Sequence, residues 1–358
     1  MHAAAAAGGA LSLERHADLD ELRDEWTALA ERCGNPFSTW EWASTWWAHF
    51  GRDRPLLITA CRRPDGTLAA ILPLYLSSRG PLRLARFVGH GVGDVLGPIC
   101  APEDAPLAAD GLRQLIADEG RRWDLLLAER MPSDIFGGLV QGHVLQTEAN
   151  PLLPTEGASW DEYLASCSSN MRGQIRNKRN KLQRKLGAQF RLADDPDRLD
   201  EDFDTLVKLH HARWGEPRSF PEDRTAFHRA FVRQAFDRGW LRLWFLEVDD
   251  QAVAAWYGLR FGDVEWYYQS GRDPEWDRWS VGLTLLARTL QGAFDDGMSA
   301  YAFLRGDEGY KKRFATQDAG LETVALANGP IGAAAISAAR AAKHMPPSFR
   351  NRVLRTLG

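Results

Sequence analysis

Cysteine is scarce in this sequence, and its placement argues against two kinds of structure. The chain has four cysteines in 358 residues, none of them in a C-x-x-C pair: Cys33, Cys61, Cys100 and Cys167. The nine histidines form no metal-ligand spacing near them, apart from the adjacent His210 and His211. We therefore expect no disulfide framework and no bound metal, and this cysteine usage is typical of a reducing cytoplasm.

Long apolar runs and an excess of positive charge are also missing. No apolar stretch reaches the roughly 18 residues that a membrane-spanning helix needs. Residues 1–10 lack the basic start and long apolar core of a signal peptide. The formal net charge is −4, which gives no global attraction to nucleic acid or anionic membranes. We expect a cytoplasmic protein without a transmembrane segment, in which such binding would need a local basic patch.

Tryptophan, by contrast, is abundant. The chain has 14 tryptophans, and 44% of its residues are hydrophobic, an ordinary balance for a globular protein. Trp buries a large area and needs a partner for its N–H group, which favours a Trp-rich core. Stacking against bases or sugars is the alternative. The length of 358 residues is comfortable for two domains.

The order of predicted elements is the same in both halves. The first half reads helix, helix, hairpin, short strands, helix and strand, near 18–32, 37–51, 55–77, 84–99, 108–119 and 123–130. The second half repeats this order and adds a short helix, over 199–214, 223–238, 241–261, 263–271, 280–296, 299–305 and 307–314. Such a repeat predicts two copies of one α/β fold, each a mixed β-sheet flanked by helices.

The repeat divides the chain into four segments. Residues 1–150 form the first domain. Residues 151–198 are a basic connecting helix region, and residues 199–325 form the second domain. Residues 326–358 are an Ala-rich and then basic tail.

The segment 273–297 has a pattern suited to binding phosphate. A strand is followed by a short loop, and a helix then opens with Ser280, Val281 and Gly282. Exposed N–H groups and the positive dipole end make a helix start attractive to phosphate. Ser280 is placed to cap the helix, and Gly282 lets a ligand approach the backbone. An ordinary capped helix start is the alternative, although ligands of α/β folds dock at this end of the strands.

The next strand delivers charged and phenolic side chains into a short helix. They fall within seven positions: Arg305, Gly306, Asp307, Glu308, Tyr310 and Lys311. Two carboxylates, a phenol and several cations in so short a stretch indicate either a site or a solvated helix start with ordinary ion pairs.

With these stretches the second half resembles the acetyltransferase domain of the CelD/BcsL-type family, a branch of the GNAT superfamily related to the Fem-type aminoacyl transferases. The resemblance rests on MRGQIRNKRNKLQRK, LHHARWGEPRSF, EWYYQSGRDPEWDRWSVGLTLL and FLRGDEGYKKRF. It reaches the first half through the Trp-rich helix and the hairpin ending LPLYLS, and it covers most of residues 18–320. It implies two tandem GNAT-like acyltransferase domains. We expect the second domain to be catalytic, because the helix start at Gly282 and the cluster around Tyr310 both lie there. We expect the first domain to be non-catalytic and to shape the groove for the acceptor of the acyl group.

The resemblance implies an N-acyltransferase that uses acetyl-CoA or another acyl-CoA as co-substrate. In GNAT enzymes the helix after the fourth core strand receives the CoA pyrophosphate through backbone N–H groups. In this chain that helix start is Trp279, Ser280, Val281, Gly282 and Leu283. The usual signature is Gln/Arg-x-x-Gly-x-Gly/Ala, whereas this chain has Arg278-x-x-x-Gly282, so its spacing departs from the family's.

Roles for side chains follow from the same resemblance. An amine must lose a proton to attack the thioester, and the departing thiolate must gain one. Tyr310 occupies the place where the superfamily often has its thiolate-protonating tyrosine, and Glu265 is a candidate base, with Asp307 in the same cluster as Tyr310. The expected substrate contacts are Tyr268, Arg305 and Lys311. Of the neighbours Tyr267 and Tyr268, one must face away from the cleft.

Residues 168–187 form a basic segment with seven Lys or Arg and no acid. Apolar residues at helical spacing predict a helix with a narrow apolar stripe: Met171, Ile175, Leu182 and Leu186. Its cationic face is a solvated surface, a grip on an anionic substrate or on the 3′-phosphate of CoA, or an RNA contact. The run lacks the aromatic residues that single-stranded nucleic acid prefers. The basic tail, with Arg350, Arg352 and Arg355, is either solvated or a contact to a membrane surface or partner.

The acceptor that the family implies is an amino sugar or another small amine in envelope or exopolysaccharide (cellulose-type) metabolism. Two other hypotheses stay open. One is a Fem-like transferase that draws on aminoacyl-tRNA and grips the RNA with the basic helix. The other is a non-catalytic GNAT-fold binding protein, and the unusual spacing at Gly282 is the feature that supports it.

Overall fold

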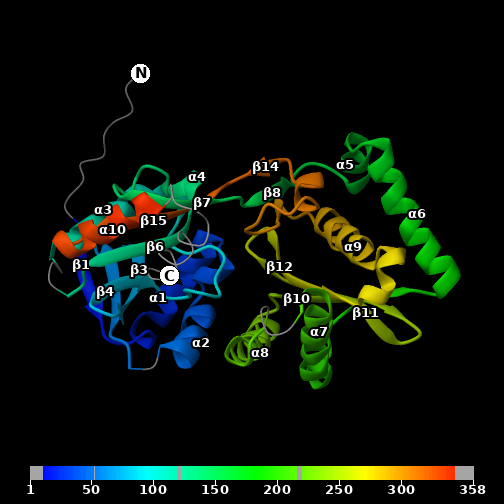
Figure 1. Cartoon of the computed structure of the whole chain (residues 1–358), viewed down its shortest axis with the longest axis horizontal. Helices are drawn as coiled ribbons and strands as arrows, with labels where there is room; N and C mark the ends of the chain where they lie inside the picture. The colour runs from blue at the N-terminus through cyan, green and yellow to red at the C-terminus, as the bar shows by residue number, and fades with distance from the viewer. Residues whose placement is uncertain (1–10, 52, 119–121, 216–219, 343–358) are drawn as a thin grey trace. The chain divides into compact units, whose positions relative to one another are not determined.

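The computed structural model describes residues 11–51, 53–118, 122–215 and 220–342, which form two compact units (Figure 1). The first unit is Met1–Ala149 with Ala319–Gly358, and the second is Asn150–Asp318. The units differ from the expected ranges on both sides of the second unit. Residues 151–198, expected as a connecting region, belong to the second unit. Strand β15 (Leu321–Ala327) belongs to the first unit, where it pairs with two strands. The basic tail residues Arg350, Arg352 and Arg355 lie outside the described residues.

The first unit is built on a mixed sheet with the strand order β1-β2-β3-β4-β6-β15-β7, and β5 pairs with β3. The strands are β1 (Ser12–His16), β2 (Leu56–Arg62), β3 (Leu68–Arg79), β4 (Leu82–Phe87), β5 (Ile99–Cys100), β6 (Leu125–Pro132) and β7 (His143–Glu148). The helices are α1 (Arg23–Cys33), α2 (Trp40–Phe50), α3 (Ala105–Asp118), the short α4 (Ser133–Phe136) and α10 (Pro330–Ala342).

The tryptophans of α1 and α2 form part of the core of this unit. Trp26 and Trp46 are buried, and their N–H groups donate to the carbonyls of Ser38 at 2.8 Å and His90 at 2.9 Å. Each ring therefore buries its large apolar area without leaving its polar atom unpaired. At these positions the interpretation of the tryptophans as core residues is confirmed.

The second unit is built on a sheet with the strand order β14-β8-β13-β12-β11-β10-β9. The strands are β8 (Pro151–Pro154), β9 (Gln189–Leu192), β10 (Leu241–Val248), β11 (Gln251–Phe261), β12 (Val264–Arg272), β13 (Ala300–Ala302) and β14 (Gln317–Asp318). The helices are α5 (Trp160–Ser166), α6 (Ser169–Leu186), α7 (Leu199–Trp214), α8 (Glu222–Asp237) and α9 (Val281–Asp295). Helices α7 and α8 cover one face of the sheet, and α9 covers the other with α6 beside it (Figure 1).

One parallel strand pair in each sheet marks the repeat. Strand β4 pairs with β6 in parallel in the first unit, and β12 pairs with β13 in parallel in the second. Each pair is connected by a helix, α3 in the first unit and α9 in the second. This shared arrangement confirms the prediction of two copies of one mixed α/β fold. No helix in the described part of the chain is long and apolar enough to cross a membrane.

The basic segment folds as predicted into one helix. Ser168 caps α6 by accepting a hydrogen bond from the Met171 N–H at 3.3 Å. Three of the four apolar positions, Met171, Ile175 and Leu182, are buried, and the fourth, Leu186, packs against the same core cluster, which contains residues of α9.

Helix α7 and strand β12 approach each other backbone to backbone at Gly271. A Cβ atom added at Gly271 would lie 2.3 Å from the His210 backbone nitrogen and 2.4 Å from the Leu209 carbonyl carbon. Neither backbone atom can move aside without shifting α7. The glycine is therefore needed for the packing of α7 on β12.

We predict that Gly271→Ala lowers the free energy of unfolding by about 3 kcal/mol, because the added methyl group overpacks this contact. Gly173→Ala on α6 is the matched control, since its Cβ would meet only Asn177 Nδ2, at 4.0 Å. That control should be neutral or stabilising by up to roughly 1 kcal/mol. Urea unfolding of both variants measures the difference, and equal midpoints for Gly271→Ala and the wild type would contradict it.

Candidate functional site

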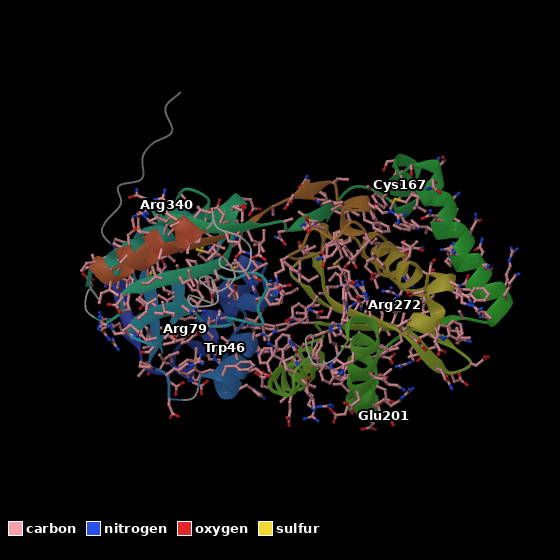
Figure 2. The ribbon with its side chains drawn as sticks, viewed as in Figure 1. Trp46, Arg79, Cys167, Glu201, Arg272 and Arg340 are labelled. Atoms are coloured by element: carbon pink, nitrogen blue, oxygen red, sulfur yellow. The ribbon has the colours of Figure 1, made fainter. Side chains whose placement is uncertain are left out.

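A cavity of about 430 Å³ lies in the second unit, between strands β11 and β12 and helix α9. We call it the first cavity. Its lining includes Ser270 and Arg272 from the end of β12, Ser280 and Gly282 from the start of α9, and Tyr310; Arg272 is labelled in Figure 2. The helix start and the tyrosine that the sequence singled out thus lie at one cavity.

The five residues expected to bind the pyrophosphate divide into two groups. Ser280, Gly282 and Leu283 line the first cavity, whereas Trp279 and Val281 do not. Val281 is buried in the core, and the Trp279 ring packs under the Lys181 ammonium group, which lies 4.9 Å from its centroid. Backbone amides near the cavity are still available at the helix start, since the first four N–H groups of a helix have no partner within it.

The helix start itself differs from the expectation. Ser280 is the N-cap residue but its side chain makes no capping hydrogen bond, and its backbone is left-handed with φ 58°. Its carbonyl accepts the first helical hydrogen bond, from the Thr284 N–H at 3.0 Å. A Cβ added at Gly282 would meet only the flexible side chain of Arg272, at 3.4 Å. The open approach to the backbone predicted at Gly282 is thus present, whereas the predicted Ser280 cap is wrong.

Three guanidinium groups border the first cavity, those of Arg213, Arg272 and Arg313. The one carboxylate among the described residues of its lining is Asp277, which pairs with Arg272 at 2.5 Å between Nε and Oδ1. The hydrogen bond from Arg272 holds the pKa of Asp277 below its usual value. The lining therefore carries a net positive charge, which attracts anionic ligands such as phosphates.

A chain of hydrogen bonds runs from Tyr310 into the sheet. The Tyr310 hydroxyl donates to the Tyr267 hydroxyl at 3.3 Å, and the latter lies 2.6 Å from Ser270 Oγ. Ser270 Oγ also accepts from Arg213 at 2.5 Å. On the backbone side, His210 Nδ1 donates to the Ser270 carbonyl at 2.9 Å. Tyr310 is thus linked through two hydroxyls to a cation, and α7 fixes the far end of the chain.

The same surroundings determine the protonation of Tyr310. Burial raises the pKa of the Tyr310 phenol well above its usual range, and the neighbouring Tyr267 raises this pKa further. The phenol is consequently protonated throughout the neutral range. It therefore cannot act as a base in that range.

Tyr268 does not line the first cavity, in contrast to the expected substrate contact. Its hydroxyl lies 3.4 Å from His228 Nε2 on α8, and its ring packs edge-on against Tyr257. The register between β11 and β12 shifts at Tyr257/Gly258, so Tyr268 is an extra residue in its strand. Such a bulge breaks the alternation of side chains. It allows Tyr267 and Ser270, three residues apart, to share the face of the first cavity.

Glu265 does not line the first cavity either, so the structure argues against its role as the base. Its side chain is 1% exposed, and its carboxylate pairs with Arg260 Nε at 2.8 Å and Arg242 Nε at 3.5 Å. Burial raises the pKa of Glu265, and the two guanidinium groups oppose that rise. Glu265 lies near the start of β12, about 17 Å along the strand from Ser270. It is part of an ion-paired cluster within the fold.

The charged residues that the sequence singled out around Tyr310, which are Arg305, Asp307 and Lys311, lie apart from the first cavity. Asp307 is exposed and pairs with Lys312 at 3.6 Å, and Arg305 is exposed as well. Lys311 is buried, where its ammonium group pairs with Glu308 at 3.0 Å and donates to the Arg305 carbonyl at 2.5 Å. Lys311 thus stabilises the turn that presents Tyr310 and does not line the first cavity.

Sequence reasoning did not single out four side chains of this site as functional: Arg213, Ser270, Arg272 and Arg313. All four fall within the stretches that carry the family resemblance, so their types were visible. Their convergence was not, because α7, the end of β12 and the segment after Tyr310 meet only in the folded unit.

Residues 169–312 match the model of the acetyltransferase (GNAT) domain. The matched range lies within the second unit and contains β12, the start of α9 and Tyr310. The second unit therefore contains a GNAT-type acyltransferase domain, and the first unit shares its mixed α/β arrangement with one parallel strand pair.

Two solved structures are similar to nearly the whole chain. FemX is 11% identical, with a TM-score of 0.62 over 87% of this chain and 97% of that chain. L-PGS from Bacillus licheniformis is 12% identical, with a TM-score of 0.56 over 88% of this chain and 96% of that one. At these identities the likeness shows the fold alone. No curated protein matches this chain.

Proposed function

We propose that the second unit binds acetyl-CoA or another acyl-CoA in the first cavity and transfers the acyl group to a small amine, such as an amino sugar. The observation that carries this proposal is that the start of α9 and the Tyr310 hydroxyl border the same cationic cavity. The amides near Gly282 would bind the pyrophosphate, with Arg213 and Arg272 as positively charged neighbours.

The residues present suffice for the chemistry of acyl transfer. The amine nitrogen bonds to the thioester carbon, the carbon–sulfur bond breaks, and the thiolate takes a proton from Tyr310. Asp277 is a poor base, because Arg272 lowers the pKa of its carboxyl. We propose that the amine proton passes to water, and that water returns a proton to Tyr310 to complete the turnover. An assay of thiol release from acetyl-CoA with a panel of amines, checked by mass spectrometry of the products, tests the function.

The finer assignment is also part of this proposal. A CelD/BcsL-type enzyme acting in exopolysaccharide metabolism is supported by the motif resemblance alone, and a cytoplasmic location by the scarce and scattered cysteines. Glucosamine and other amino sugars are therefore the first acceptors to assay. Thiol release without any acetylated amine would show hydrolysis instead and would count against the proposal.

The hydrogen-bond chain gives a test by pH. Burial is the main cause of the raised pKa of Tyr310, and Tyr267 adds to it. In Tyr267→Phe the pKa of Tyr310 should fall, but burial remains and still holds it above its usual range. We predict that Tyr310 stays protonated and that kcat shows no new alkaline limb between about pH 7 and pH 9. A new limb in this range would show that Tyr267, and not burial, keeps Tyr310 protonated.

One observation favours a second candidate, an aminoacyl transferase that draws on charged tRNA. Helix α6 exposes four cations, Arg176, Lys181, Arg184 and Lys185, and FemX shares the fold of the chain. This candidate requires tight RNA binding that weakens steeply with salt. Titration with tRNA at two salt concentrations separates it from the acyl-CoA proposal, which predicts little binding.

A further inference from the structure

A second cavity, of about 610 Å³, adjoins the first. It lies where α5 meets α6 and is closed on one side by the segment after Tyr310. Figure 2 labels Cys167 at this junction. Its described lining combines small polar side chains with larger and apolar ones. The polar residues include Ser166, Ser168, Asn170, Gln174 and Thr316, and the apolar ones include Met171, Phe314 and Ala315.

Arg313 borders both cavities. Its backbone N–H donates to the Tyr310 carbonyl at 3.2 Å, so the two residues are one turn apart. Its guanidinium donates to Gln174 Oε1 at 2.8 Å across the second cavity. A group held at Arg313 in the second cavity is therefore held one helical turn from the phenol in the first.

The chemistry of the second lining selects for a particular ligand. Hydroxyl and amide groups donate and accept hydrogen bonds, as sugar or amino-alcohol hydroxyls require. Among the described residues that line this cavity none is a carboxylate, and Arg313 is the one cation. A guanidinium with donors to spare is well matched to a carboxylate or a phosphate.

We propose that the second cavity is the acceptor site and that the acceptor is a small hydroxylated amine carrying a carboxylate or a phosphate. This inference rests on the proposed acyl transfer and names its substrate class. The anion lies on Arg313, the hydroxyls contact the serine and asparagine side chains, and the amine points into the first cavity. There its nitrogen displaces the thiolate, which takes the proton of Tyr310, while the surplus proton of the amine passes to water.

Cys167 provides a direct probe of occupancy. It is partly exposed in the second cavity, and Cys33, partly exposed in the other unit, is an internal control. Two ligand pairs differ only in the anion: glucosamine 6-phosphate against glucosamine, and serine against ethanolamine. We expect one anionic amine to slow alkylation of Cys167 by iodoacetamide several-fold, with Cys33 unchanged and the neutral partner inactive. Protection by glucosamine 6-phosphate would show that the anion is a phosphate, and protection by serine would show that it is a carboxylate.

Two variants sharpen the test. Arg313→Gln should raise the concentration needed for protection by about tenfold or more, as the loss of a hydrogen bond to a charged group predicts. Thr316→Trp should fill the second cavity and raise the acceptor KM. Asn180→Trp, exposed on α6 and outside both cavities, is its matched control. Thr316 lines the second cavity and not the first, so Thr316→Trp should bind acetyl-CoA within twofold of the wild type.

The outcomes separate this inference from the proposed function. Acetyl-CoA binding without protection of Cys167 by either anionic amine would overturn the acceptor site and leave acyl transfer intact. Protection of Cys167 by acetyl-CoA itself, or weaker acetyl-CoA binding in Thr316→Trp, would assign this cavity to the donor and overturn the inference. Equal protection by charged and neutral amines would overturn the anionic substrate class.

Discussion

Gly282→Trp is expected to abolish binding of acetyl-CoA, with a rise in Kd of about a hundredfold or more. An indole at this position would occupy the first cavity, about 430 Å³ in volume, and cover the amides at the start of α9. The pyrophosphate would lose at least two hydrogen bonds to a charged group, each worth roughly 1.5–3 kcal/mol, and a tenfold change in Kd corresponds to about 1.4 kcal/mol. Isothermal titration with acetyl-CoA measures the effect.

The same substitution on α6 is the matched control. Gly173 lies within a helix, lines neither cavity, and its Cβ would meet only Asn177 Nδ2 at 4.0 Å. Gly173→Trp should bind acetyl-CoA like the wild type. If Gly282→Trp also binds with the wild-type Kd, the donor does not lie at the start of α9.

Tyr310→Phe is expected to lower kcat by about a hundredfold or more while the Kd for acetyl-CoA stays within twofold. A positioned general acid contributes typically 10²- to 10⁴-fold, and the phenylalanine ring keeps the packing of Tyr310 while removing its proton. Steady-state rates of thiol release and titration of the same preparation give both quantities.

Tyr268→Phe is the control for this prediction, because Tyr268 faces α8 and does not line the first cavity. It should retain most of the wild-type kcat. Unchanged turnover in Tyr310→Phe would remove Tyr310 from the mechanism, and a large fall in acetyl-CoA affinity would make it a binding residue instead.

Local patterns in the sequence predicted the elements that build the first cavity. The amphipathic period predicted a helix over 199–214, and α7 has these bounds. The turn predicted near Asp250 separates β10 from β11. The helix predicted at 280–296 is α9, Val281–Asp295. These elements were predictable because period, turn residues and helix starts are properties of neighbouring residues.

What the sequence could not supply depends on contacts between distant residues. Strict alternation cannot reveal the bulge at Tyr268, and so cannot show that Tyr267 and Ser270 share a face. From the sequence alone Glu265 is a candidate base. In the fold, Arg242 of β10 and Arg260 of β11 pair with its carboxylate. Likewise, the apolar run Leu321–Ala327 forms β15, but its partners β6 and β7 lie far away in the chain.

A crystal structure of the protein with bound CoA would test the proposed donor site most directly. We predict that the pyrophosphate lies against the backbone amides of Val281–Leu283, since the Ser280 amide already donates to the Asp277 carbonyl. We also predict that the CoA sulfur lies within about 4 Å of the Tyr310 hydroxyl, as a hydrogen bond to sulfur requires. CoA bound elsewhere in the chain, or bound here with its sulfur directed away from Tyr310, would contradict the proposed site and mechanism.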